Sequence, residues 1–316
     1  MIDFEYLRTG VYGLANAHKA GTLAGHLGAA VAAGYFIGED QSDLDDRVFT
    51  GIEGEIKRII AGEEAIWWNV KKSGITPADL FKPLPKEDPQ PDEIKSLAAA
   101  LQKNVDQTRQ SGHNVIFASI AIRALSDHRD FATPSVVAGI RKLIEGFNSA
   151  QAGRGYYGKQ KGWLTGDQVK LPPDDAFRPY GSIQSMIDTT IDELIATASV
   201  KKQGFGGLWH VINHAAAIAE LHRLGFKELA QQALPAHHQH VRLWRSLPDV
   251  EEELGPVVKA EHDPRQPAYW QDMLKRDEAR LTHRIKTLYG FHATVRFIEN
   301  EARRKQAEDA FLYLMA

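Results

Sequence analysis

The 316-residue chain contains no cysteine. It therefore cannot form disulfides, zinc–thiolate sites or iron–sulfur clusters, and it cannot use a thiol as a nucleophile. A metal ion, if one is bound, must be held by nitrogen and oxygen ligands. The chain also has little excess charge, because 38 basic residues face 41 acidic residues for a net charge of -3. No whole-molecule field favours nucleic acid or an anionic membrane, so the expected partner is a small apolar molecule.

Long apolar runs are equally scarce. The longest uncharged run, from Ala20 to Gly38, approaches membrane-spanning length but contains His26 and several glycines. It predicts a buried helix whose small residues allow close packing, and not a membrane span. The first residues lack both the basic segment and the apolar core of a secretion signal, so the expected location is the cytoplasm.

Apolar residues recur with helical spacing, and stretches rich in β-branched and aromatic residues are few. The pattern predicts an all-α fold, arranged as a helical toroid or an irregular α/α bundle with an apolar, histidine-lined centre. One domain is expected over residues 1–316. The predicted helices cover residues 11–36, 44–71, 92–109, 113–127, 134–150, 183–200, 207–223, 226–245, 268–288 and 291–314.

Two segments interrupt the helical pattern. Residues 82–91 are charged and rich in proline, which predicts an extended surface connection. Residues 152–180 are rich in glycine and aromatic residues. A loop of this length is expected to be functional, here as a lid over a pocket, with a plain surface loop as the alternative.

A glycine or small residue followed by a histidine and an almost purely apolar helix recurs along the chain. Neutral imidazole is the commonest metal ligand in proteins, so several imidazoles in dry helices indicate a metal site. The expected ligands are His26, His113, His210, His214 and His292. The alternative is that no metal is bound and that each ring makes a hydrogen bond to a nearby carbonyl or carboxylate.

His210 and His214 are four residues apart, which places both rings on one face of a helix. Zinc proteases use this spacing but require a glutamate directly after the first histidine, where this chain has Val211. Zinc proteolysis is therefore not expected. The other histidines lie in polar surroundings and are expected on solvated faces: His128, His222, His237, His238, His240, His262 and His283.

Three of the histidine segments resemble motifs of questin oxidase-like proteins. The run from Asn213 to Gly225 resembles the Asn-His helix of that family, which ends in Leu-Gly. The run from Gly112 to Leu125 is similar to its histidine helix closing on Arg-Ala-Leu, and His292 to Val295 is similar to a later motif. In this chain the first two motifs occur in the reverse of the family's order.

The resemblance implies an α-helical oxidoreductase that opens polycyclic aromatic ketones by oxygenation with histidine-bound iron. The resemblance implies that His113, His214 and His292 are metal ligands. His26 is added as a fourth candidate only because its helix is expected to be buried. Iron is thus the preferred metal, with zinc or manganese as alternatives. Acidic residues are expected to complete or orient the ligand shell, the candidates being Glu53, Glu63 and Glu64, and tryptophans such as Trp67, Trp68 and Trp209 to form apolar walls.

Two other functions remain open from the sequence. One is a helical ligand-binding or scaffold protein whose histidines only make hydrogen bonds. The other is a terpene-cyclase-like enzyme, because Asp43 to Asp46 match the Asp-x-Asp-Asp pattern of such cyclases. That chemistry needs a protonated acid in a dry pocket, and the competing interpretation of these acids is a helix cap.

Overall fold

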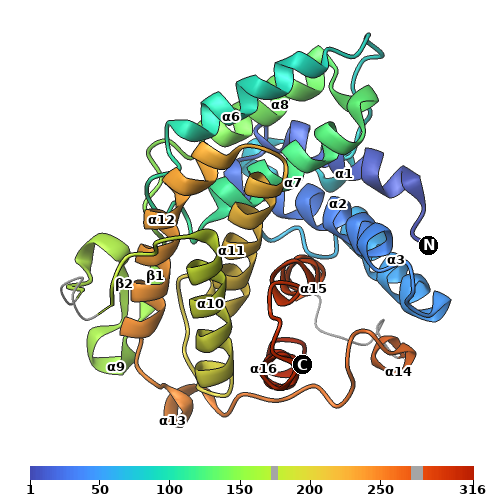
Figure 1. The fold of residues 1–316 in the computed structure, drawn as a ribbon. Coiled ribbons are helices and arrows are strands. Elements are labelled where there is room, and N and C mark those ends of the chain that lie inside the picture. The colour runs from blue at the N-terminus through green and yellow to red at the C-terminus, as the bar shows by residue number, and fades with distance from the viewer. Residues whose placement is uncertain (172–176, 272–279) are drawn as a thin grey trace. The chain divides into compact units, whose positions relative to one another are not determined.

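The fold is all-α, as the sequence predicts. A computed structural model describes residues 1–171, 177–271 and 280–316, which are mainly helical and include 16 α-helices (Figure 1). The helices are α1 (Phe4–Ala17), α2 (Gly25–Asp40), α3 (Asp46–Ala61), α4 (Val70–Ser73), α5 (Pro77–Leu80), α6 (Ile94–Gln102), α7 (His113–Asp127), α8 (Pro134–Glu145), α9 (Gly158–Lys161), α10 (Ile183–Thr197), α11 (Gly207–Arg223), α12 (Lys227–Ser246), α13 (Glu251–Leu254), α14 (Pro267–Trp270), α15 (Leu281–Val295) and α16 (Glu301–Phe311).

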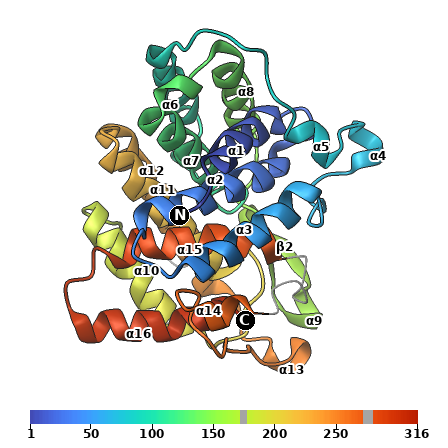
Figure 2. The same cartoon turned by 90° about the vertical axis from the view of Figure 1, so that its right-hand side faces the viewer.

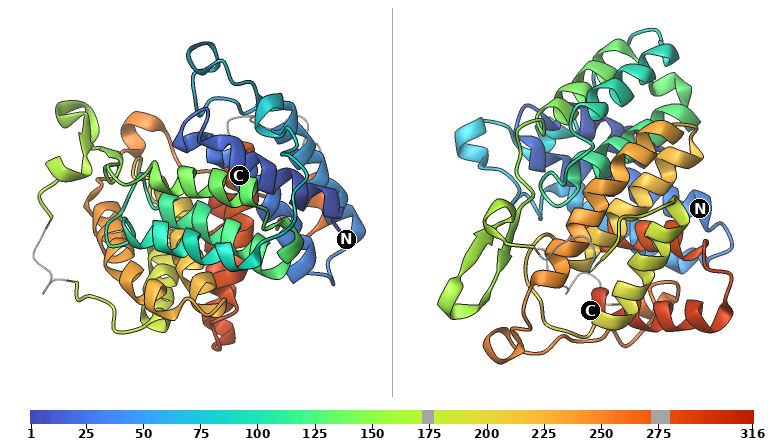
Figure 3. Two further views of the ribbon diagram at one scale, coloured as in Figure 1. Left: turned by 90° about the horizontal axis from the view of Figure 1, so that it is seen from above. Right: turned by 60° about the vertical axis from the view of Figure 1, so that its left-hand side comes forward.

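Short 3₁₀ turns and one small hairpin complete the described structure. The turns are η1 (Thr22–Ala24), η2 (Pro91–Glu93), η3 (Arg129–Phe131), η4 (Gly166–Gln168) and η8 (Leu312–Leu314). Strands β1 (Arg154–Tyr156) and β2 (Trp163–Thr165) pair antiparallel, with Gly155 opposite Leu164. Figure 3 shows this hairpin, which lies in the segment predicted as a loop. Residues 172–176 of that segment lie outside the described residues, and its role as a lid stays a prediction.

The chain forms two compact units, each assembled from separated stretches of sequence. Unit 1 contains residues 1–103, 117–148 and 262–289. Unit 2 contains residues 104–116, 149–261 and 290–316. Helices α7 and α15 each contribute residues to both units. The toroid and the single domain stay predictions.

In unit 1, α1 and α2 pack together at very short range because glycines line their contact (Figure 1). A Cβ atom on Gly28 would lie 2.3 Å from the backbone nitrogen of Leu14, and one on Gly10 would lie 2.6 Å from that of Ala32. The prediction of one helix over residues 11–36 is therefore wrong. The chain turns back at Gly21, whose φ of 133° is open to glycine and not to other residues.

Helix α3 is capped at its N-terminus by Asp45, whose side chain accepts a hydrogen bond from the Arg47 backbone N–H. It ends before Gly62, ten residues short of the predicted end, because Gly62 adopts a left-handed φ of 83°. Asp45 is exposed, and its hydrogen bonds with Arg47 lower its pKa to about 2. An exposed, ionised carboxylate fits the capping interpretation and lacks the dry, protonated state that cyclase chemistry requires.

The rest of unit 1 contains a second pair of neighbouring helices and an irregular connection. Helices α6 and α8 lie side by side (Figure 2). Residues 82–90, between α5 and η2, form neither helix nor strand.

Among the described residues, no helix combines the length and hydropathy that a membrane crossing requires.

In unit 2, α11 packs against α10 and α12. The expected solvated position of His237, His238 and His240 is wrong, because all three are buried on α12. His237 and His240 share a helix face with Ala233, Val241 and Trp244 in the i, i+3 and i+4 pattern. That face is apolar apart from the imidazoles, which is why it lies inside.

The C-terminal helices also differ from the prediction. Helix α15 runs from Leu281 to Val295 through Gly290, whereas the sequence suggested a break there. A Cβ on Gly290 would lie 2.3 Å from the Asn213 side chain, so this glycine serves close packing in unit 2 and does not end a helix. Residues 272–279 of the predicted helix 268–288 lie outside the described residues.

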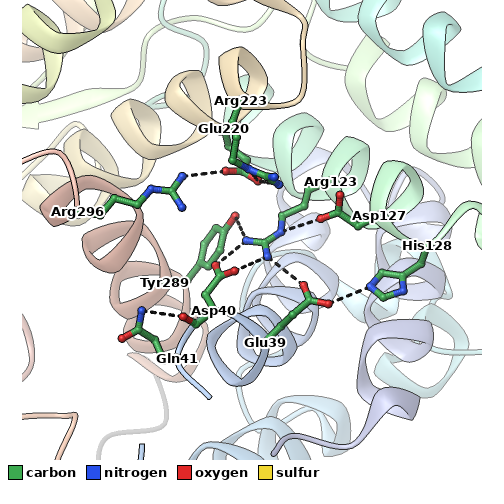
Figure 4. Close-up of polar contacts among 10 residues, drawn as sticks. All are labelled: Glu39, Asp40, Gln41, Arg123, Asp127, His128, Glu220, Arg223, Tyr289 and Arg296. Atoms are coloured by element: carbon green, nitrogen blue, oxygen red, sulfur yellow. Dashed lines mark hydrogen bonds and ion pairs between the residues drawn. The ribbon is translucent and has the colours of Figure 1, made fainter. Parts of the chain in front are cut away.

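The buried side chain of Arg123 holds the C-terminal end of α2 through an ionic cluster within unit 1 (Figure 4). Its guanidinium donates to both carboxylate oxygens of Asp40, at 2.7 and 2.8 Å, and to Glu39 at 3.0 Å. It also donates to the Tyr289 hydroxyl at 3.2 Å. In unit 2, Figure 4 shows Glu220 on α11 paired with Arg223 and Arg296. Both clusters tie helix ends to their neighbours.

Candidate metal centres

All five histidines predicted as metal ligands are buried, with at most 9% of the side chain exposed. The predicted dry surroundings are therefore confirmed. His26 belongs to unit 1, whereas His113, His210, His214 and His292 belong to unit 2. Each unit contains its own cluster of buried imidazoles, and their convergence on one ion stays a prediction.

In unit 1, His26 lies at the start of α2 and is fully buried. Its Nδ1 lies 2.8 Å from the carbonyl oxygen of Leu23. Since a carbonyl can only accept a hydrogen bond, Nδ1 carries the proton and Nε2 of the neutral ring carries the lone pair. The ring stacks on Trp67, with centroids 3.8 Å apart and planes 4° apart. This fixed orientation is typical of imidazoles that bind metals.

His283 on α15 stands beside His26, with ring centroids 5.2 Å apart. A ring nitrogen of each lies within 4.8 Å of the other, and both side chains are buried. The expected solvated position of His283 is therefore wrong. Its flanking charges suggested a wet surface, but Arg284 is itself buried against Glu55.

Glu64 adds a carboxylate to these two imidazoles. Its Oε2 accepts the backbone N–H of Thr282 at 2.5 Å, and its Oε1 lies 3.9 Å from Nδ1 of His283. Among the described residues, Oε1 has no hydrogen-bond partner although the side chain is fully buried. Of the three predicted acidic candidates, the structure brings Glu64 to the histidines. Glu53 binds the backbone of Asp3, and Glu63 pairs with Arg58.

Two hydrogen-bond donors belong to the same cluster. The indole nitrogen of Trp67 is buried and has no hydrogen-bond partner in the described part of the chain. Lys286 lies one helical turn after His283, with its amine 5.5 Å from the centre of the Phe117 ring. A buried polar atom left unsatisfied costs about 1–3 kcal/mol, so the orphaned donor of Trp67 and the orphaned acceptor of Glu64 in one cluster indicate a bound group.

Burial also governs the charges of this cluster. It raises the pKa of Glu64 to about 7 and lowers the pKa of Lys286 to about 7, while the attraction between the two groups opposes both shifts. It also lowers the pKa of His283, and the nearby charges of Lys286 and Arg280 act in the same direction. The imidazole therefore stays neutral and keeps a lone pair for a ligand.

In unit 2, His113 and His210 form a close pair with their Nε2 atoms 3.0 Å apart. Nδ1 of His113 contacts the carbonyl oxygen of Gln110, and Nδ1 of His210 lies 2.6 Å from that of Gly206. Both Nδ1 atoms therefore carry protons, and in the neutral rings both Nε2 atoms carry lone pairs. Two facing lone pairs repel, so a proton or a cation between them is required.

His214, one turn after His210, belongs to a chain of imidazoles. Nε2 of His240 donates to the Phe205 carbonyl at 2.8 Å, so its Nδ1 accepts from Nδ1 of His214 at 3.3 Å. Nε2 of His214 therefore carries a lone pair. It is fully buried and has no hydrogen-bond partner among the described residues. Phe205 itself has a φ of 48°, a strained conformation of the kind that clusters at functional sites.

Two glycines make room for imidazoles of this cluster. A Cβ on Gly112 would lie 2.7 Å from Cγ of His214, and one on Gly206 would lie 2.3 Å from Cγ of His210. Both glycines also have positive φ angles, 82° and 74°. Each glycine thus leaves room for an imidazole and turns the chain into the helix that follows it.

Three other histidines have local contacts. His292, predicted as a ligand, lies in the last turn of α15 and contacts the Phe291 ring. His237 accepts the Tyr180 hydroxyl at Nδ1 and donates to the Val211 carbonyl from Nε2, at 3.1 and 3.0 Å. His18 donates to the Ala15 carbonyl at 2.9 Å. Comparison with known protein families, with curated proteins and with solved structures found no match to this chain.

The buried imidazoles of α12 predict acid lability. Burial lowers the pKa of His237 to about 3 and that of His240 to about 4. The unfolded state, with ordinary values near 6.5, binds more protons below that pH, so stability falls as the pH decreases. From about pH 7.5 to about pH 5, His237 alone should lower the free energy of unfolding of metal-free protein by about 2 kcal/mol.

Urea unfolding at several pH values measures this dependence. A His237→Gln variant should lose part of it, whereas a matched His222→Gln variant, changed at a partly exposed residue of α11, should follow the unsubstituted protein. Equal slopes of stability against pH in all three proteins would contradict the assignment.

Proposed function

We propose that this chain is a metal-dependent oxidoreductase in which His26, His283 and Glu64 of unit 1 bind one divalent transition metal, with iron preferred. The observation that carries the proposal is the buried, unsatisfied carboxylate oxygen of Glu64, which lies 3.9 Å from the His283 ring, beside the buried imidazole of His26. Ligands bound about 2.0–2.2 Å from one ion can stand 3.9 Å apart, as Glu64 and His283 do.

The ligand types support iron. Two histidines and one carboxylate form the ligand set of non-haem Fe(II) oxygenases, which leaves coordination positions open. Such an ion supplies Lewis-acid and redox chemistry when it is bound. The resemblance to questin oxidase-like proteins points to the same class, with an aromatic or polyketide-like substrate.

The neighbouring side chains have defined tasks in this proposal. Trp67 holds the His26 ring by stacking, and its orphaned indole N–H can donate to an oxygen atom of a bound substrate. Lys286 offers a second donor, and Phe117 adds an apolar wall next to it and to His26. Donors above an apolar wall suit a phenolic or ketonic aromatic molecule.

Metal content tests the proposal. Protein stripped with a chelator and reloaded anaerobically with Fe²⁺ should lose one bound equivalent when His283 is changed to Ala or Glu64 to Gln. Glu64→Gln keeps the size of the side chain, so it separates loss of the ligand from loss of packing. His18→Ala is the matched control, because His18 is a half-buried imidazole of unit 1 whose Nδ1 donates to a local carbonyl.

Oxygen uptake with a polyhydroxylated anthraquinone as the probe tests the oxidoreductase step, and it should depend on Fe²⁺ and on Glu64. Folded variants that keep every iron equivalent would refute the site. An iron-free protein that binds the probe without turnover would favour the ligand-binding alternative.

A further inference from the structure

The imidazoles of unit 2 form a cluster that the proposed function does not use. Its centre is the pair of Nε2 atoms of His113 and His210, 3.0 Å apart. Ligand nitrogens about 2.0–2.1 Å from one tetrahedral ion stand about 3.3 Å from each other, close to this separation. Both Nδ1 atoms donate to backbone carbonyls, and this contact on the far nitrogen typically orients an imidazole for metal binding.

We propose that unit 2 has a metal site of its own, in which His113 and His210 bind a divalent transition metal through Nε2 and His214 supplies a third nitrogen. His210 and His214 are one turn apart on α11, so their rings lie on the same side of that helix. Within the described residues, the three rings do not form a set with all ligand nitrogens inside 4.8 Å. The proposal therefore includes a shift of the His214 side chain toward the ion.

His240 is a positioning residue for this site. It acts through His214, because its Nε2–H is committed to the Phe205 carbonyl and its Nδ1 can only accept. That contact fixes the proton of His214 on Nδ1 and presents the lone pair of Nε2. A ligand held in the wrong tautomer could not bind the ion through Nε2.

The site suits an ion that is intermediate between hard and soft, such as Zn²⁺, Co²⁺ or Fe²⁺, because all of its ligands are neutral imidazoles. No carboxylate is required, so the bound ion keeps its full positive charge in a buried setting. An anion or an ionised substrate oxygen would then be a favourable further ligand.

Co²⁺ titration of the His283→Ala protein isolates this site, because that variant lacks a ligand of the site in unit 1. The variant should still bind one equivalent, seen by its visible absorption. Adding His113→Ala or His210→Ala should abolish the absorption, whereas adding His222→Ala, a matched change on α11, should leave it intact. Binding of Co²⁺ that is unchanged by the His113 and His210 substitutions would overturn the proposal.

One further measurement guards against variants that fail to fold. Zn²⁺ added to the unsubstituted, metal-free protein should shift the ¹⁵N resonances of Nε2 in His113 and His210. This measurement requires no substitution in unit 2. Unmoved resonances at saturating Zn²⁺ would mean that the pair shares only a proton, which refutes the site.

The role of His240 is tested by Co²⁺ titration in the His283→Ala protein. His240→Leu should weaken Co²⁺ binding about 10–100-fold. His240→Gln, whose amide can donate and accept, should restore part of the affinity. Equal affinity in both variants would refute positioning. If the substitutions in unit 2 remove Co²⁺ while Glu64→Gln and His283→Ala remove nothing, this site stands and the proposed function falls.

Discussion

A Glu55→Gln protein is expected to be about 3–5 kcal/mol less stable than the unsubstituted protein. Glu55 on α3 accepts two hydrogen bonds from Arg284 on α15, one from Nε at 2.7 Å and one from a terminal nitrogen. Both side chains are buried in unit 1. The amide would leave the Arg284 charge without its counter-charge in a dry environment, and this imbalance accounts for most of the expected loss.

Urea unfolding measures this loss, and two controls interpret it. A Glu55→Leu, Arg284→Met double variant removes both charges and should be far closer to the original stability. Lys305→Ala breaks an exposed pair with Glu301 and should change nothing measurable. If Glu55→Gln behaves like Lys305→Ala, the pair is not buried as described.

The same substitution should also weaken the metal site in unit 1. Arg284 follows His283 directly, so the ion pair fixes the part of α15 that presents this imidazole. Iron should bind more weakly to folded Glu55→Gln protein although no ligand has changed. This effect separates positioning of the helix from direct coordination.

A Gly28→Ala protein is expected to lose about 3 kcal/mol or more of stability. The added methyl would lie 2.3 Å from the Leu14 nitrogen and 2.6 Å from the Gly13 carbonyl carbon, so α1 and α2 must separate. Backbone atoms cannot move aside as a flexible side chain can. The shift in the midpoint of thermal or urea unfolding measures this loss.

Gly54→Ala supplies the matched control on α3. A Cβ at this position meets no atom within 4 Å, so alanine should raise the stability by about 0.5–1 kcal/mol through its better helix propensity. Opposite signs for the two substitutions are the expected result. A stabilising Gly28→Ala would contradict the close approach of α1 and α2.

The sequence predicts helices best where a glycine is followed directly by a long apolar run. Helices α7 and α11 have the bounds expected for them, because each follows a positive-φ glycine and continues as an apolar run. The turn between α1 and α2 was missed because no proline marks it and small, uncharged residues continue from it into α2. The break depends on Gly21 and on contact between distant glycines, and helical periodicity carries no information about such contact.

The same distinction holds for the candidate sites. Burial of His26, His113, His210 and His214 follows from the apolar runs around them. His283 was missed because its neighbours, Arg284 and Lys286, are charged, and only the tertiary partners of those charges make a dry environment possible. His240 could have been found from its spacing with Ala233, Val241 and Trp244, whereas the tautomers depend on carbonyls that no sequence pattern locates.

The path of the chain limits how this protein can be dissected. It passes from one unit to the other five times, and two of these passages fall inside α7 and α15. No contiguous fragment consists of one complete unit alone, so a clone cut at any single boundary would divide at least one of the two units. Because each unit consists of three separate segments of the chain, moving one unit into another protein would require several cuts at once.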